Sequence, residues 1–149
     1  MAKYALTALV VGLLLGAEQK KGDAKKDQEA LQGTWKVVTV EHDGKAEKDP
    51  GDFVMTFSKD TFTVKKGDEV IVKGTFRLDP AKKPRAIDMA IKEAKKEQDN
   101  GKEVHGIYEL DGDSLKWCAA EPGETDRPKE FATRSGGKHI LATFTRGKP

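Results

Sequence analysis

The sequence predicts an all-β domain, an antiparallel up-and-down barrel of about eight strands. Apolar and polar residues alternate through most of the chain after residue 30, as they do along strands with one buried face. Turn-forming residues separate these segments, and several connections are so short that neighbouring strands must form antiparallel hairpins. Closing the sheet removes its two unpaired edges, so a barrel is favoured over an open sheet or a sandwich.

Each predicted strand corresponds to one alternating row. The longest row runs from Val70 to Leu78, with Lys, Thr and Arg opposite it. The other rows are Trp35–Thr39, Phe53–Phe57, Phe62–Val64, Ile87–Ile91, Val104–Leu110, Leu115–Ala119 and Ile140–Phe144. Pairs such as Asp43-Gly44 and Asp111-Gly112 tolerate the left-handed backbone of tight turns, and they mark where these strands end.

Two segments are less regular. Residues 86–98 contain good helix formers, but the period of two favours a strand to about Lys92 followed by a charged loop, with a helix as the alternative. Residues 121–138 form a long connection that contains Pro122, Gly123 and Pro128. Phe131 within it is expected to cover one end of the barrel or to lie on a short ninth strand.

Residues 1–17 are typical of a secretory signal peptide, because Lys3 precedes an almost unbroken apolar run that ends at Ala17. The run is shorter than the ~18 residues needed for a membrane-spanning helix. A buried N-terminal helix and an uncleaved membrane anchor are the alternatives. We therefore expect export to the periplasm or the extracellular space, without stable membrane insertion after cleavage.

Residues 18–29 are rich in charged and polar residues and lack large apolar side chains, which predicts a disordered tether after the signal helix. Residues 30–149 form the predicted barrel domain, which is long enough to bury a core. Its single cysteine, Cys118, cannot form a disulfide within one chain. The 27 Lys and Arg residues nearly balance the 25 Asp and Glu residues, a composition that does not indicate nucleic-acid binding. We expect a monomer.

The segment Leu31-Gln32-Gly33-Thr34-Trp35 resembles the Gly-x-Trp entry of lipocalin-like barrels. In those proteins the tryptophan closes one end of the barrel and packs against an arginine of the last strand. Arg146 shares the parity of Phe144, so it is expected to point inward and to contact Trp35. The resemblance thus implies a lipocalin-like barrel that is closed by Trp35 and Arg146.

A longer pattern is similar to a family of small exported domains known mainly from planctomycete bacteria. It consists of residues 31–38 (LQGTWKVV), 106–110 (GIYEL), 113–118 (DSLKWC) and 127–131 (RPKEF), in that order. The resemblance covers the whole predicted domain and implies its fold. It supplies no activity and no catalytic residues.

The sequence offers little for catalysis, so we predict that the protein is not an enzyme and has no cofactor. The three histidines (His42, His105 and His139) do not have the spacing of metal ligands and are expected on the solvated surface, so no metal site is predicted. Cys118 is expected to face outward as an inert thiol, with His105 as a conceivable neighbouring base. Among the carboxylates only Glu41 lies near the inner rows. Serine-nucleophile and phosphate-loop motifs are missing.

Large apolar side chains are predicted to line the barrel, and they permit two functional readings. In the leading one the protein is a non-enzymatic binding module that holds a small apolar ligand in the barrel. The alternative is a filled barrel that serves as a structural or protein-interaction module of the cell envelope, and a hydrolase with an unrecognised site comes third. The lining residues of the leading reading are Phe57, Phe76, Met89, Tyr108 and Trp117.

Overall fold

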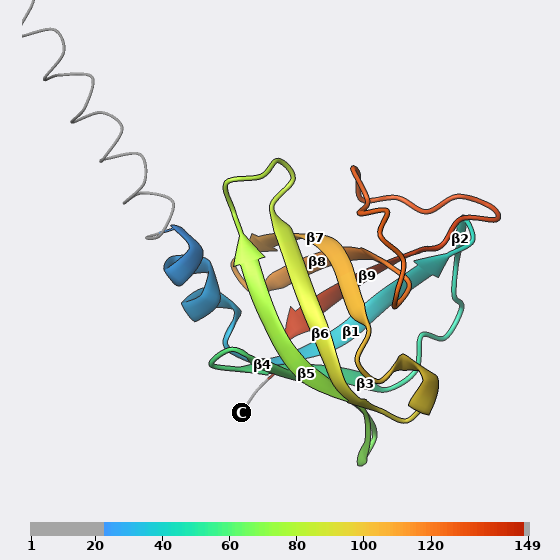
Figure 1. Cartoon of the computed structure of the whole chain (residues 1–149), viewed down its shortest axis with the longest axis horizontal. Helices are drawn as coiled ribbons and strands as arrows, with labels where there is room; N and C mark the ends of the chain where they lie inside the picture. Colours follow the sequence, from blue (N-terminus) through green and yellow to red (C-terminus); the bar gives the residue numbers. More distant parts are fainter. Residues whose placement is uncertain (1–22, 148–149) are drawn as a thin grey trace, which may run out of the picture.

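The computed structural model describes residues 23–147, which form a closed eight-stranded antiparallel barrel with one extra short strand and an N-terminal helix (Figure 1). The helix covers residues 23–31. The strands are β1 (Gly33–His42), β2 (Lys45–Ala46), β3 (Phe53–Ser58), β4 (Thr61–Lys66), β5 (Glu69–Asp79), β6 (Ala86–Ala94), β7 (Glu103–Asp111), β8 (Ser114–Ala120) and β9 (His139–Arg146), with the 3-10 turn η1 (Glu97–Asp99) between β6 and β7.

The sheet closes because β1 pairs with both the second and the last strand of the ring. From β3 to β9 each strand pairs with the next one in sequence. Residues 33–36 of β1 pair with β3, and residues 35–42 pair with β9. The predicted all-β antiparallel barrel is therefore confirmed, and each of the alternating rows lies on one of its strands.

A bulge in β1 changes which side chains face inward. The register against β9 shifts between Val37 and Thr39, so Val40 pairs with the buried Ala142 and faces the interior. Glu41 consequently faces outward, where its Oε1 accepts a hydrogen bond from Thr133 Oγ1 at 2.8 Å. Its expected place near the inner rows is wrong, because the bulge reverses the alternation on which that expectation depended.

The two irregular segments are also settled. Residues 86–94 form β6 and are followed by η1, so the strand prediction is confirmed and the helical alternative is wrong. The extra strand is β2, which forms a hairpin with the end of β1. Phe131 lies in neither expected place: it is outside any strand, with Lys116 Nζ of the outward-facing side of β8 5.5 Å from its ring centroid.

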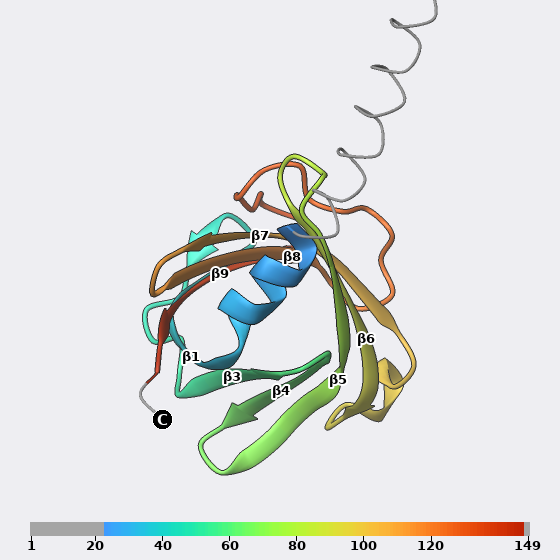
Figure 2. The ribbon, with the colours of Figure 1, turned by 90° about the vertical axis from the view of Figure 1, so that its left-hand side faces the viewer.

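The N-terminal helix lies across one end of the barrel (Figure 2). We call this the helix end, and the opposite end, which carries η1 and β2, the far end (Figure 1). The predicted tether is wrong for residues 23–29, because they are helical and Asp27 is buried. Residues 1–17 and 18–22, for which a signal peptide and the start of the tether were predicted, lie outside the described residues. No helix within residues 23–147 is long and apolar enough to cross a membrane.

Candidate functional site

Trp35 and Arg146 meet at the helix end, as predicted. They are paired across β1 and β9, and the guanidinium carbon lies 4.3 Å from the centroid of the indole ring. The indole is fully buried, and its Nε1 donates a hydrogen bond to the Leu31 carbonyl at 2.8 Å. The same guanidinium donates to the carbonyls of Ala30 and Gln32, which lie at the end of the helix and lack partners within it. The barrel strands and the helix therefore fix each other.

A buried carboxylate fastens the helix to the opposite wall. Asp27 accepts hydrogen bonds from the Tyr108 hydroxyl at 2.6 Å and from Arg85 at 2.7 Å. Burial and the bond to this carboxylate raise the pKa of Tyr108 well above its ordinary value, so the phenol stays protonated. Sequence reasoning missed Asp27 because its segment has no apolar stripe. The available signal was its spacing from Leu31, since residues four apart share one helix face.

The inner wall differs between the two ends. Near the helix end it consists mainly of aromatic side chains that are almost completely buried, and near the far end of smaller aliphatic ones. The large residues are Trp35, Phe57, Phe62, Phe76, Tyr108 and Phe144. The small ones are Val40, Val64, Val72, Ala94, Val104, Ala119 and Ala142, of which the first three are only partly buried. The larger side chains thus lie near the helix end, and smaller ones lie near the far end.

The predicted lining residues all belong to the inner rows, but they do not share one environment. Phe57, Phe76, Met89 and Tyr108 are buried in the core, where the first two stack edge to face with centroids 5.0 Å apart. Trp117 is only partly buried. It pairs with Tyr108 on one side and Ala142 on the other, between the aromatic side chains of the helix end and the far end. Contact of these side chains with a ligand stays a prediction.

Residues 121–138, the outer-wall segment, cover the outside of β6–β8 without regular secondary structure. Arg127 anchors the segment by donating to the carbonyls of Ile87 and Gly106 and to Asp88 Oδ1, the last at 2.6 Å. Beneath it lies a second layer of buried side chains on the outer face of the barrel. The layer contains Ala86, Ile107, Cys118 and Ala120.

Asp88 is the polar centre of this anchorage. It also accepts from His105 Nδ1 at 2.6 Å. Burial of the carboxyl opposes ionisation, but hydrogen bonds from His105 and Arg127 hold the pKa of Asp88 below its ordinary value. His105 and His139 are half-buried, which corrects the prediction that all three histidines are solvated, and His42 alone is exposed.

The arrangement does not activate Cys118. Its Sγ lies 3.7 Å from the Ala132 carbonyl, and burial raises the pKa of the thiol, which favours the unreactive protonated form. The conceivable base His105 is instead bonded to Asp88. Within residues 23–147 there is no group of three or more His, Cys, Asp or Glu side chains that could hold a metal ion.

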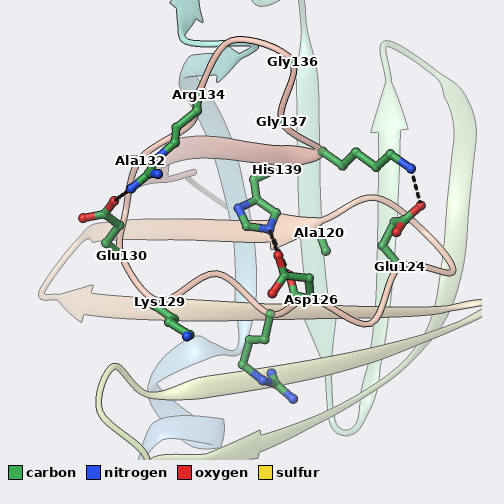
Figure 3. Close-up of a pocket in the computed structure, with 12 residues that line it drawn as sticks. Ala120, Glu124, Asp126, Lys129, Glu130, Ala132, Arg134, Gly136, Gly137 and His139 are labelled. Atoms are coloured by element: carbon green, nitrogen blue, oxygen red, sulfur yellow. Dashed lines mark hydrogen bonds and ion pairs between the residues drawn. The ribbon is translucent and has the colours of Figure 1, made fainter.

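A surface pocket of ≈ 570 Å³ opens beside the outer-wall segment (Figure 3). Basic and acidic side chains line it in pairs, with Lys138 bonded to Glu124 at 3.1 Å and Arg134 to Glu130 at 3.3 Å. His139 Nε2 lies 2.9 Å from the Asp126 carbonyl oxygen. Sequence reasoning did not find this pocket, because a long connection without regular structure carries no pattern that fixes its path.

Comparisons with known proteins found no match. The chain matches no protein-family model. It also matches none of the curated proteins and none of the solved structures. The fold is therefore established by its own strand pairing, and the function must be inferred from the geometry of the chain.

Proposed function

We propose that this protein is an exported, non-enzymatic binding module that holds a small apolar ligand in the far-end part of its barrel. The proposal includes membership of the planctomycete family of lipocalin-like domains, whose motifs the sequence resembles. Aliphatic side chains provide the contact surface, and the aromatic residues near the helix end form its floor.

The unequal inner wall is the observation that supports this proposal. Val40, Val64 and Val72 point inward from three strands, yet each stays partly accessible. These valines lie near the rim of the barrel, where they would form an apolar entrance for a small molecule. Apolar walls and a position inside a barrel are features of small-molecule sites.

Two substitutions in β1 test the proposal, because the bulge makes Val40 face inward and leaves Val38 52% exposed. Val40→Phe should fill the far-end space and prevent ligand binding, whereas Val38→Phe adds the same ring outside. Native mass spectrometry of each variant, purified from its own host, should show a bound small molecule in the wild type and Val38→Phe but not in Val40→Phe. Wild-type protein that carries no small molecule, or equal loading of both variants, would refute the proposal.

The outer-wall pocket favours a second candidate, a module that recognises another exported protein. Long ordered segments without secondary structure are frequently functional. The pocket presents Lys129 together with the ion pairs of Glu124 and Glu130, a surface suited to a polar partner. Charge reversal at Lys129 should abolish cross-linking to such a partner. It should leave small-molecule loading unchanged, which separates the two candidates.

A further inference from the structure

The indole N–H of Trp117 lacks a hydrogen-bond partner. Among the described residues its Nε1 is the only fully buried side-chain nitrogen or oxygen in this condition. The indole of Trp35 differs, since its Nε1 donates to the Leu31 carbonyl. Buried polar groups are almost always paired with protein, water or ligand, so an unpaired one requires an explanation.

No atom of residues 23–147 accepts a hydrogen bond from Trp117 Nε1. Its neighbours on the inner wall are Tyr108 and Ala142, and Val40 follows in the same row. The Tyr108 hydroxyl donates to Asp27 at the helix end. The indole nitrogen can only donate, so its requirement is for an acceptor atom from outside this row.

We propose that side chains beside Trp117 move aside when the ligand enters, and that the ligand presents a neutral oxygen acceptor, such as a ketone or ester carbonyl, to Trp117 Nε1. This inference rests on the proposed function and specifies its ligand class. The inner-row neighbours Tyr108, Ala142 and Val40 include no cation, so a carboxylate beside them would be buried without a counter-charge, which strongly disfavours it. A pure hydrocarbon would fit the walls but would leave the N–H unpaired. The preferred ligand is therefore an aliphatic molecule with an uncharged carbonyl.

The test uses protein labelled with nitrogen-15 and compares nonan-2-one with decane, two probes that have the same number of non-hydrogen atoms. The indole resonance of Trp117 should move downfield when nonan-2-one binds and should move little with decane. Trp35 serves as the internal control, because its N–H is already bonded within the protein. Both probes should compete with any ligand that the Val40→Phe substitution excludes.

Trp117→Phe retains an aromatic ring but removes the donor. We expect the affinity for nonan-2-one to fall about 5- to 10-fold, the loss typical of one hydrogen bond, and the affinity for decane to stay unchanged. An unshifted indole resonance with ketone bound would overturn the inference, since a water or protein atom would then already satisfy the N–H, but it would leave the binding module intact. If neither probe binds the wild type, the proposed function fails with it.

Discussion

The two ends of the barrel are built from different kinds of interaction. At the helix end, Asp27 and Arg146 connect the helix to the strands through charge-assisted hydrogen bonds, and aromatic rings fill the space beneath. At the far end the inner wall contains Val40, Val64 and Val72, and among residues 23–147 no comparable helix covers it. The difference teaches that the two ends place different demands on their residues: bulky rings and charged anchors at the helix end, and smaller aliphatic side chains at the far end.

The largest effect is expected from the residue at the centre of the helix end. Trp35→Ala should lower the free energy of unfolding by about 3–5 kcal/mol, because it removes a fully buried ring. Arg146→Ala should cost less, and the double variant should fall short of the sum because the two groups touch. Urea denaturation of the four proteins measures this coupling, and additive losses would contradict the contact.

The buried carboxylate should matter next. Asp27→Ala leaves the Tyr108 hydroxyl and Arg85 without their acceptor, and it should cost about 1.5–3 kcal/mol. Glu29→Ala, an exposed position of the same helix, is the control and should change stability by less than about 0.5 kcal/mol. Thermal and urea unfolding report both values. Equal effects at the two positions would mean that the helix does not hold the barrel through Asp27.

Enlarged side chains should distinguish the two parts of the interior directly. Leu115→Phe adds volume beside the buried Phe144 and should destabilise the protein by about 1–3 kcal/mol. Val64→Ile adds a methylene near the far end, where the wall is only partly buried, and should cost less than about 0.5 kcal/mol. Similar losses in urea denaturation would show that both parts are packed equally.

Alkaline pH should weaken the helix end by a smaller amount. The pKa of Tyr108 is raised in the folded state, whereas an unfolded tyrosine titrates near pH 10. The stabilisation that the protonated Tyr108 provides is therefore complete below about pH 10 and is lost as pH rises above that value. The loss in the free energy of unfolding at pH 10.5 should be less than about 1 kcal/mol. Tyr108→Phe should be less stable at pH 7 but should lack this part of the alkaline loss, as unfolding curves at both pH values would show.

The strands could be predicted because their signal is local. Alternation identified β3 to β9 and the start of β1, and the turn residues placed their ends. The contact of Trp35 with Arg146 could be predicted because alternation along each strand points both side chains inward and the closed barrel makes the first and last strands neighbours. Parity also placed Cys118 outside the core, although only the structure shows that residues 121–138 bury it there.

The remaining features depend on contacts between distant segments. Asp27 lies in a polar stretch whose helix is stabilised by Tyr108, 81 positions away, so the alternation that predicts the strands could not indicate it. Nothing in the alternation of β1 before the bulge predicts the shift that turns Glu41 outward. The candidate site has the same character, since the unpaired donor of Trp117 becomes visible only when its neighbours are known.

Closure by the first and last strands also has a consequence for folding. Thr39 and Thr143 bond across this seam although they lie 104 positions apart in the sequence. Sheets that depend on such distant pairings fold slowly, commonly in ~ms to s, because a long loop must be closed before the contacts can form. Until β9 pairs with them, β1 and β8 each have an unpaired edge. A chain that ends before β9 should therefore aggregate through these edges, whereas in the full chain β9 pairs with both of them.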